Sequence, residues 1–401
     1  MTGVPKGERM NISFIGRINA GKSSVINSLI GQDISIVSEF PGTTTDPVAK
    51  RYELIPIGPV TIYDTAGYDD TTNLGEKRIK ATLKVLFRSD LVVLVLDING
   101  LNETDKFYIN KLNDMKMPYI VVWNKSDLEA IPNEVSAFFD KNNIEVIPIS
   151  TIDGSGIDVL KEKLVAKIQK LKGNENKILA DIIDKEDLIV LVIPIDESAP
   201  KGRIILPQVQ VIREILDCGA IAVCSREIEL SSTLATLKGK IKLVITDSQA
   251  IDFVSKTVPD DILLTTFSTL FARYRGDLLP FLDGLEKLKT LKAGDKVLIA
   301  EACSHHSMGD DIGRVKIPNW VNKFLGFDLT YTNVNGHDFP DDLEKYKLVI
   351  HCGGCMMTRM EILRRINECQ RRGVSITNYG MLISFVHGDL QRVIKVFNLK
   401  V

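Results

Sequence analysis

The sequence predicts an α/β protein with one larger, mostly parallel sheet domain and two smaller α/β domains behind it. Three observations carry this prediction. Short apolar runs of strand length alternate with amphipathic stretches along the chain, a pattern typical of parallel sheets covered by helices on both faces. A glycine-rich loop follows the first of these runs, and two clusters of cysteine and histidine follow later runs. At 401 residues the chain is long enough for two or three hydrophobic cores.

The first predicted domain covers residues 1–172. It contains five strand-like runs, which are Ile12 to Ile15, Val60 to Tyr63, Leu91 to Leu96, Tyr119 to Trp123 and Ile144 to Ile149. A polar stretch at 172–177 is the predicted linker. The second domain, residues 180–264, has apolar runs at 188–195, 220–224 and 242–246 and a helical pattern at 207–216. It carries no chemical motif that we recognise, which favours a scaffold or dimerisation domain.

The third predicted domain covers residues 265–401. After an amphipathic helix at 278–291, strands at 296–300, 347–350 and 374–377 lead into Cys303, Cys352 and Asn378 respectively. Ligands of open parallel sheets bind beyond the carboxyl ends of the strands. Both cysteine clusters are therefore expected at that edge of the sheet.

The composition argues against two classes of partner. A net charge of -2 gives no general attraction to nucleic acid or to an anionic membrane. The first nine residues lack the apolar stretch of a secretory signal, and no apolar run approaches the roughly 20 residues of a membrane span. We expect a cytoplasmic protein, and in that reducing compartment its six cysteines favour ligands, redox groups or buried apolar residues over disulfides.

The glycine-rich loop predicts a nucleotide phosphate site. Its sequence fits the Gly-x4-Gly-Lys-Ser pattern between a predicted strand and a predicted helix, and the candidate residues are Gly16, Asn19, Ala20, Gly21, Lys22, Ser23 and Ser24. In such a loop the backbone N–H groups and the helix amino end bind phosphate oxygens. Lys22 is expected to reach the β- and γ-phosphates, and the Ser23 hydroxyl to bind Mg²⁺.

Further motifs complete the site and select guanine. Asp64 and Gly67 follow the second predicted strand, where the carboxylate can hold Mg²⁺ through water and the glycine N–H can meet the γ-phosphate. Asp127, in the Asn124-Lys125-Ser126-Asp127 motif, can accept both ring donors of guanine, whereas adenine would leave this carboxylate without donors. The nucleotide is therefore GTP. Two further contacts are expected, from Ser150 to the base and from Thr44 to Mg²⁺.

These motifs resemble those of the TrmE-Era-like GTPases over residues 10–170. The resemblance implies a P-loop GTPase domain that converts GTP to GDP and phosphate, with Lys22, Thr44, Asp64 and Gly67 in the catalytic set. Asn19 matches the asparagine that holds K⁺ in potassium-stimulated members, although a loop asparagine bonded to its own backbone is an alternative. Tyr68 stands where many GTPases have a water-orienting glutamine. We therefore expect slow hydrolysis that depends on potassium or a partner.

The cysteine clusters are Cys303-Ser304-His305 and His351-Cys352-Gly353-Gly354-Cys355. Thiolates select zinc, copper or iron-sulfur clusters. A Cys-x-x-Cys pair can also exchange disulfides, and three cysteines with a histidine can hold structural zinc. We favour an iron-sulfur cluster over structural zinc. Structural zinc usually stabilises small domains, whereas this domain has enough strands and helices for a core of its own. The two glycines also let backbone N–H groups approach cluster sulfurs.

The whole pattern is similar to the HydF family of FeFe-hydrogenase maturation proteins. The resemblance implies a 4Fe-4S cluster on Cys303, Cys352 and Cys355, with a fourth position that is labile or filled by His305, His351 or Glu301. It also implies a homodimeric scaffold that passes a diiron precursor to apo FeFe-hydrogenase, together with the radical-SAM maturases HydE and HydG. The alternative is an RNA-associated TrmE-Era-like GTPase with structural zinc, but the Gly-x-x-Gly loop of a KH domain is absent from the sequence.

Overall fold

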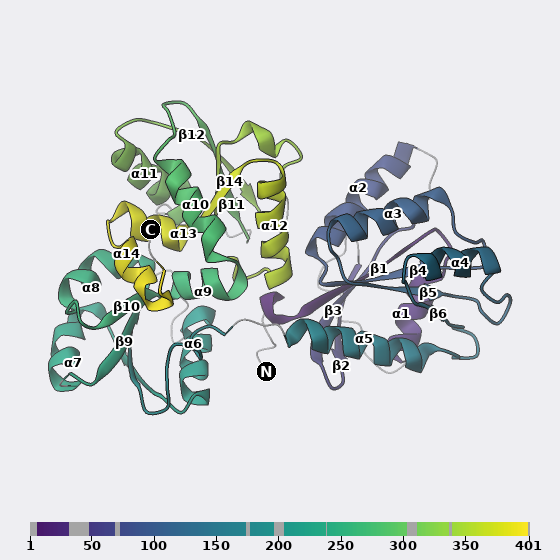
Figure 1. The fold of residues 1–401 in the computed structure, drawn as a ribbon, viewed down its shortest axis with the longest axis horizontal. Coiled ribbons are helices and arrows are strands. Elements are labelled where there is room, and N and C mark those ends of the chain that lie inside the picture. Colours follow the sequence, from purple (N-terminus) through teal and green to yellow (C-terminus); the bar gives the residue numbers. More distant parts are fainter. Residues whose placement is uncertain are drawn as a thin grey trace. The chain divides into compact units, whose positions relative to one another are not determined.

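The computed structural model describes residues 6–31, 48–68, 73–173, 177–195, 204–237, 239–302, 311–336 and 339–399. The chain divides into two compact units, residues 1–175 and 176–401 (Figure 1). No helix in these described ranges has the length and apolar character needed to cross a bilayer.

The first unit is built on a six-stranded sheet in the order β2-β3-β1-β4-β5-β6. Strand β2 pairs antiparallel with β3, and the other neighbours are parallel. The strands are β1 (Met10–Gly16), β2 (Val48–Leu54), β3 (Gly58–Asp64), β4 (Leu91–Leu96), β5 (Tyr119–Trp123) and β6 (Val146–Pro148). The helices are α1 (Lys22–Ile30), α2 (Asn73–Arg88), α3 (Glu103–Asp114), α4 (Asn133–Lys141) and α5 (Ile157–Lys172), after a short 3-10 turn, η1 (Lys6–Glu8).

The central strands of this sheet are buried on both faces, since all six residues of β4 are buried. Successive residues of a strand point to opposite faces. Phe14 of β1 thus packs in a core that includes residues of α1 and α5, and its neighbour Ile15 in a core that includes residues of α2, α3 and α4. This arrangement leaves the loops at the carboxyl ends of β1, β3 and β5 along one edge of the sheet.

The second unit contains two four-stranded parallel sheets, ordered β10-β9-β7-β8 and β12-β11-β13-β14. The strands of the first are β7 (Leu188–Val192), β8 (Ile221–Ser225), β9 (Ile241–Thr246) and β10 (Leu263–Thr266). The strands of the second are β11 (Lys296–Glu301), β12 (Thr330–Asn335), β13 (Leu348–His351) and β14 (Ser375–Asn378).

Helices surround both sheets of the second unit. They are α6 (Leu206–Asp217), α7 (Leu230–Leu237), α8 (Ile251–Thr257), α9 (Phe267–Arg275), α10 (Leu278–Leu288), α11 (Ile317–Leu325), α12 (Arg359–Arg371), α13 (Tyr379–Val386) and α14 (Leu390–Ile394). Shorter turns are η2 (Glu227–Glu229), η3 (Ser248–Ala250), η5 (Leu343–Lys345) and η6 (Lys395–Phe397), with a π-helical turn, η4 (Ile312–Lys316), before α11. Helix α9 contributes to two cores, because Phe267 and Leu270 pack in the core around β7 and Ala272 in the core around β11.

The predicted α/β class is confirmed, and the described strands lie close to the predicted ones. Strands β2, β10 and β12 are additional to the prediction. Strand β12 is an edge strand with the polar sequence Thr-Tyr-Thr-Asn-Val-Asn, and none of its residues is fully buried, so it lacks the apolar run that marks a buried strand. The three domain boundaries stay a prediction.

Candidate functional site

The predicted phosphate loop connects β1 to α1 in the first unit. Lys22 begins α1 and is 7% exposed. Its Nζ donates to the carbonyl oxygens of Gly16 and Arg17, at 3.0 and 2.7 Å. The lysine thus folds back over its own loop, and its charge lies at the centre of the turn whose N–H groups would bind phosphate.

The two predicted magnesium groups lie together. The Ser23 hydroxyl donates to Asp64 Oδ2 at 2.6 Å. This contact follows from the sheet, because Asp64 at the end of β3 is paired with Phe14 of β1. Thr44, the third predicted magnesium group, lies outside the described residues.

The loop that follows Asp64 lies directly on the phosphate loop. The backbone N–H and the hydroxyl of Thr65 both donate to the carbonyl of Phe14, at 3.3 and 2.7 Å. A Cβ added at Gly67 would overlap the backbone and side chain of Ile18. Glycine at position 67 is therefore required for this close approach, which keeps the Gly67 N–H beside the phosphate loop.

The predicted guanine motif is tied to the same loop. Asn124 Nδ2 donates to the Ala20 carbonyl at 2.9 Å, and Lys125 Nζ donates to the Asn19 carbonyl at 2.9 Å. Asp127 is exposed, as a base-binding carboxylate must be before it meets its ligand, and Ser150 is buried after β6. Asn19 is exposed with a positive φ of 60°. The structure thus brings the phosphate and base motifs together at one edge of the sheet.

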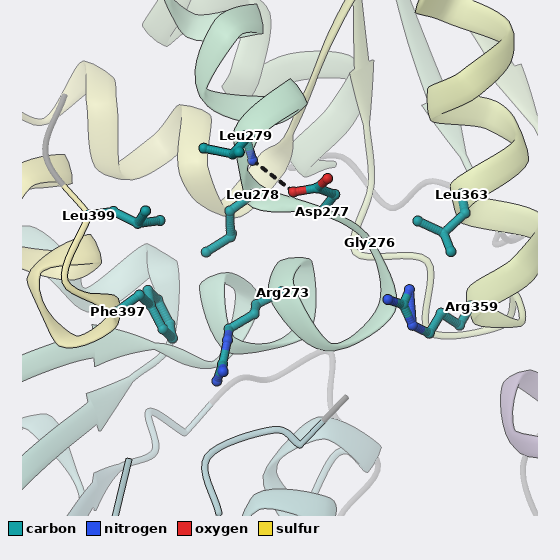
Figure 2. A pocket seen from close by; sticks show the side chains of 9 residues that line it. All are labelled: Arg273, Gly276, Asp277, Leu278, Leu279, Arg359, Leu363, Phe397 and Leu399. Atoms are coloured by element: carbon teal, nitrogen blue, oxygen red, sulfur yellow. Dashed lines mark hydrogen bonds between the residues drawn. The ribbon is translucent and has the colours of Figure 1, made fainter. Parts of the chain in front are cut away.

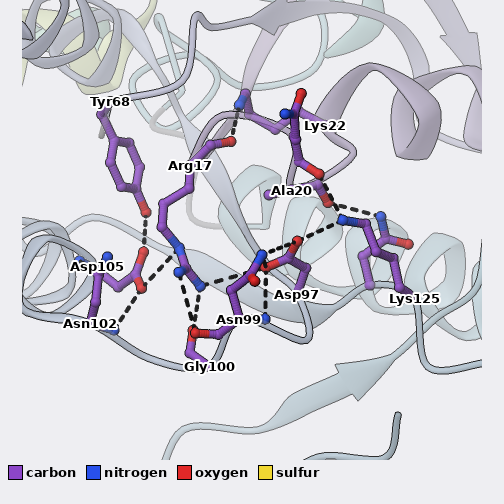
Figure 3. Close-up of polar contacts among 12 residues, drawn as sticks. Arg17, Ala20, Lys22, Tyr68, Asp97, Asn99, Gly100, Asn102, Asp105 and Lys125 are labelled. Carbon is purple, nitrogen blue, oxygen red and sulfur yellow. Dashed lines mark hydrogen bonds and ion pairs between the residues drawn. The ribbon is translucent and has the colours of Figure 1, made fainter. Parts of the chain in front are cut away.

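A buried charge network under the phosphate loop was missed by sequence reasoning (Figure 3). Arg17 forms ion pairs with Asp97 at 3.6 Å and with Asp105 at 3.4 Å. Lys125 reaches Asp97 Oδ2 at 2.7 Å. Burial raises the pKa of Asp97, but hydrogen bonds from Lys125 and Asn99 outweigh it, so that the pKa lies below its ordinary value. The network therefore joins the phosphate loop to the guanine motif.

Tyr68 belongs to the same network. It is 1% exposed, and its hydroxyl donates to Asp105 Oδ1 at 2.6 Å. Burial and the neighbouring Asp105 carboxylate hold the pKa of Tyr68 well above its ordinary value. The Tyr68 hydroxyl thus points into the protein at an anchored position, and it lies one residue after Gly67. The capping box of Asn102 and Asp105 marks the start of α3 in the sequence, but no local signal links it to Tyr68.

The predicted cysteine edge lies in the second unit, where three parallel strand ends meet. His351 is paired with Ala300 of β11 on one side and with Asn378 of β14 on the other. Cys352 follows β13, and its Sγ accepts from the backbone N–H groups of Ala302 at 3.0 Å and Gly354 at 3.4 Å. Burial raises the pKa of the Cys352 thiol to about 11 in spite of these two donors.

His351 is 1% exposed, and both of its ring nitrogens have protein partners. Nδ1 lies 2.6 Å from the Cys352 carbonyl, and Nε2 lies 3.1 Å from Arg365 Nη1. A carbonyl oxygen can only accept and a guanidinium can only donate, so Nδ1 carries the proton and Nε2 accepts. Burial, with the Arg365 charge, lowers the pKa of His351 to about 3. The imidazole is therefore neutral and fixed.

Glu301 lies at the end of the neighbouring strand. Its Oε1 accepts from the Tyr379 hydroxyl at 3.1 Å, which links the ends of β11 and β14. Cys303 and His305 lie outside the described residues. Within the described part of the chain, no group of three His, Cys, Asp or Glu side chains is arranged to hold a metal ion.

A pocket of about 410 Å³ lies beside the junction of α9 and α10 (Figure 2). It is lined by Arg273, Gly276, Asp277, Leu278, Leu279, Arg359, Leu363, Phe397 and Leu399. Arg273 forms an ion pair with Asp181 and lies over the Phe397 ring, 5.3 Å from its centroid. Arg273, and Arg275 on the same helix, thus both have partners within the protein.

Three family models match the chain. Residues 11–125 match the 50S ribosome-binding GTPase model, so this region is a GTPase domain. Residues 178–276 match the hydrogen maturase F dimerization domain, and residues 280–396 match the hydrogen maturase F tetramerization domain. The two maturase models therefore occupy most of the second unit.

Curated relatives match the GTPase region. The tRNA modification GTPase MnmE of Clostridioides difficile (strain 630) is 34% identical over 185 residues, which are 45% of this chain and 40% of that protein. The GTPase Der of Kosmotoga olearia is 33% identical over 177 residues, 41% of this chain and 40% of that protein. The chain spans about two fifths of the length of these relatives.

Solved structures give a weaker similarity. Era from Aquifex aeolicus bound to GDP.AlF4- is 21% identical and covers 58% of this chain and 98% of its own, with a TM-score of 0.33. The G domain of the FeoB iron transporter of T. maritima is 24% identical and covers 40% of this chain and 98% of its own, with a TM-score of 0.30. At these TM-scores the similarity supports no conclusion about this chain.

Proposed function

Because the chain belongs to the hydrogen maturase F family and carries a GTPase domain, we propose that it is a GTP-hydrolysing scaffold. It would bind a 4Fe-4S cluster, assemble a diiron precursor and transfer that precursor to apo FeFe-hydrogenase. The observation that carries the proposal is the combination of a GTPase domain with two maturase domains. The Cys352 loop adds support, since it lies at the carboxyl ends of parallel strands, where ligands bind.

The GTPase half is proposed to convert GTP to GDP and phosphate. Lys22 exchanges its two loop carbonyls for phosphate oxygens, which develop negative charge as the γ-phosphoryl group leaves. Ser23 and Asp64 are close enough to hold one Mg²⁺ together, with Thr44 as the predicted third group. Bound there, Mg²⁺ would neutralise charge on the β- and γ-phosphates.

Three contacts are proposed to set the specificity and rate of hydrolysis. Asp127 accepts the two donors of guanine, while the Gly67 N–H meets the γ-phosphate. Tyr68 cannot orient the attacking water, because its hydroxyl is bonded to buried Asp105. Hydrolysis is therefore slow without help, and Asn19 is proposed to hold a K⁺ ion that supplies the missing positive charge.

The cluster is proposed to bind Cys303, Cys352 and Cys355. The donor chemistry fits, since thiolates are the usual ligands of iron-sulfur clusters and N–H groups beside ligand sulfurs tune them. Ala302 and Gly354 supply such N–H groups to Cys352. Bound there, the cluster would supply an iron with an exchangeable position. Of the candidates for that position, His351 would have to give up its contact with Arg365 and Glu301 its hydrogen bond from Tyr379, and His305 stays the third candidate.

The second unit is proposed to contain a dimerisation domain, 180–264, and a cluster domain, 265–401, with a homodimer as the working assembly. The radical-SAM maturases HydE and HydG and apo FeFe-hydrogenase are the proposed partners, in the cytoplasm. An RNA-associated GTPase with structural zinc is the rival. The two differ in the metal that copurifies and in the ability to activate hydrogenase.

The test is activation of apo FeFe-hydrogenase by protein coexpressed with the two radical-SAM maturases. We expect hydrogen evolution with the wild type and with a Cys224→Ser control, because Cys224 is an exposed cysteine on β8. We expect none with Cys355→Ser, which removes one proposed thiolate. Equal activation by the Cys355→Ser and Cys224→Ser proteins would contradict the proposal that the chain is a scaffold whose cluster is bound by Cys355.

A further inference from the structure

Arg275 is a buried cation that holds the Cys352–Cys355 loop. It ends α9 and is 2% exposed. Its Nη1 lies 2.7 Å from the Met357 carbonyl, 3.3 Å from that of Gly354 and 3.4 Å from that of Cys355. One nitrogen thus faces three carbonyl oxygens of a single loop, and each of these oxygens can only accept.

The same loop geometry brings an N–H group to the Cys352 sulfur. Gly354 has a positive φ of 62°, and its N–H lies 3.4 Å from Cys352 Sγ. A Cβ at this position would lie 2.5 Å from Ile362 Cδ1. The carbonyl of Gly354 accepts from both Arg275 and the Met357 N–H. Arg275 thus holds the peptide unit that follows Gly354, while the N–H of the peptide unit before it faces the Cys352 sulfur.

The guanidinium is itself fixed by the region that matches the dimerization model. The Thr266 side chain caps α9 by accepting from the Thr269 N–H, and Phe271 packs in the core around β7. The Arg275 guanidinium lies 5.6 Å from the centroid of that Phe271 ring. Arg275 falls within the match at 178–276, whereas the loop it holds falls within the match at 280–396.

The charge of Arg275 favours a reduced cluster at this loop. A guanidinium keeps its proton at every pH that proteins tolerate. A cluster held by thiolates becomes more negative when it gains an electron, and a nearby cation stabilises that form more than the oxidised form. Burial strengthens the effect, because water screens the charge less.

We propose that Arg275 is a positioning residue that fixes the Cys352–Cys355 loop and raises the reduction potential of the cluster bound there, so that helix α9, which packs in the core around β7, sets a property of the cluster site. The inference rests on the proposed function for the presence of the cluster. The loop geometry itself belongs to the apoprotein.

The test compares Arg275→Met and Arg275→Lys with wild type and with Arg273→Met. Arg273 is a matched control on the same helix, since it forms its ion pair with Asp181 near the surface. Each protein is reconstituted without oxygen and titrated by EPR. In Arg275→Met we expect the reduced-to-oxidised ratio at the wild-type midpoint to fall at least tenfold, which corresponds to about 59 mV for one electron. Arg275→Lys keeps the charge and is expected to recover part of this shift.

A second readout follows the loop itself. We expect a chelator to remove iron from both Arg275 variants at least tenfold faster than from wild type, because methionine has no donor for the three carbonyls and the shorter lysine side chain does not place its nitrogen where Arg275 Nη1 lies. In the apoproteins, we expect a disulfide reagent to react faster with the Cys352 and Cys355 thiols of the variants. Arg273→Met should match wild type throughout. Circular dichroism checks folding, and if Arg275→Met fails to fold then Arg275→Lys carries the test.

The outcomes separate the two ideas. Wild-type potential, iron loss and thiol reactivity in both Arg275 variants would overturn the inference while leaving the cluster in place. A wild-type protein that binds no iron and sulfide would overturn the proposed function instead. In that case the thiol reactivity of the apoproteins alone decides whether Arg275 positions the loop.

Discussion

Removal of one buried hydroxyl tests the network under the phosphate loop. In Tyr68→Phe the ring remains, packed against Tyr108 with centroids 4.2 Å apart, so the change isolates the hydroxyl bond to Asp105. Both partners are buried. A hydrogen bond to a charged group contributes about 1.5–3 kcal/mol. We therefore expect the free energy of unfolding of the first unit to fall by about that amount.

The assay is urea unfolding of the full chain followed by tryptophan fluorescence. The chain has two tryptophans, Trp123 in the first unit and Trp320 in the second. A Trp320→Phe background leaves Trp123, which is buried against β4, to report the first unit alone. The matched control is Tyr119→Phe, which removes a hydroxyl whose bond to Asn113 is exposed. For this control we expect a loss below about 0.5 kcal/mol.

Equal stabilities of the Tyr68→Phe and Tyr119→Phe proteins, at unchanged denaturant dependence, would refute the reasoning. That result would mean that the Tyr68 hydroxyl is no better paired in the folded protein than in water. The hydrogen bond from Tyr68 to Asp105 would then contribute nothing to the stability of the first unit.

Three further predictions concern the two sites. Lys22→Ala should lower kcat/KM for GTP about 100-fold or more in a phosphate-release assay, since it removes the cation at the phosphates. The control Lys106→Ala removes an exposed partner of Glu103 and should match wild type. Replacing K⁺ by Na⁺ should slow GTP hydrolysis by wild type but not by Asn19→Ala. Equal rates of wild type in both salts would contradict the proposed K⁺ site at Asn19. Burial holds the pKa of His351 at about 3 in the folded protein, below the ordinary 6.5, so protonation favours unfolding. The apoprotein's second unit should lose up to about 1.4 kcal/mol per pH unit as pH falls from 6.5 toward 3; a His351→Gln variant with the same urea-measured pH dependence would contradict this.

Local patterns predicted the elements that carry the motifs. The phosphate loop and the Cys352 loop each follow a buried apolar strand, and in parallel sheets such strand ends share an edge. This rule was sufficient to expect Ser23 near Asp64, and the structure gives them a hydrogen bond. Thr44, Cys303 and His305 lie outside the described residues, so their roles stay predictions.

Contacts between distant, unpatterned residues could not be predicted. Arg17 and Asp105 are 88 positions apart, and no periodicity links them. Arg275 looks like an ordinary basic residue at a helix end in the sequence, yet its partners are backbone carbonyls of the Cys352 loop. Both contacts arise from tertiary packing alone. The Arg275 contacts leave no trace in the sequence, because a backbone carbonyl is present at every residue.

The central claim is tested most directly by measuring the iron, sulfide and zinc content of the protein and recording the EPR spectrum of its dithionite-reduced form. The protein is purified and reconstituted without oxygen, beside a Cys303→Ala, Cys352→Ala, Cys355→Ala triple variant. We predict about four irons and four sulfides per chain, as a 4Fe-4S cluster requires, with a reduced-cluster signal that the triple variant loses. Stoichiometric zinc without an EPR signal would contradict the account and favour a structural metal site on a GTPase.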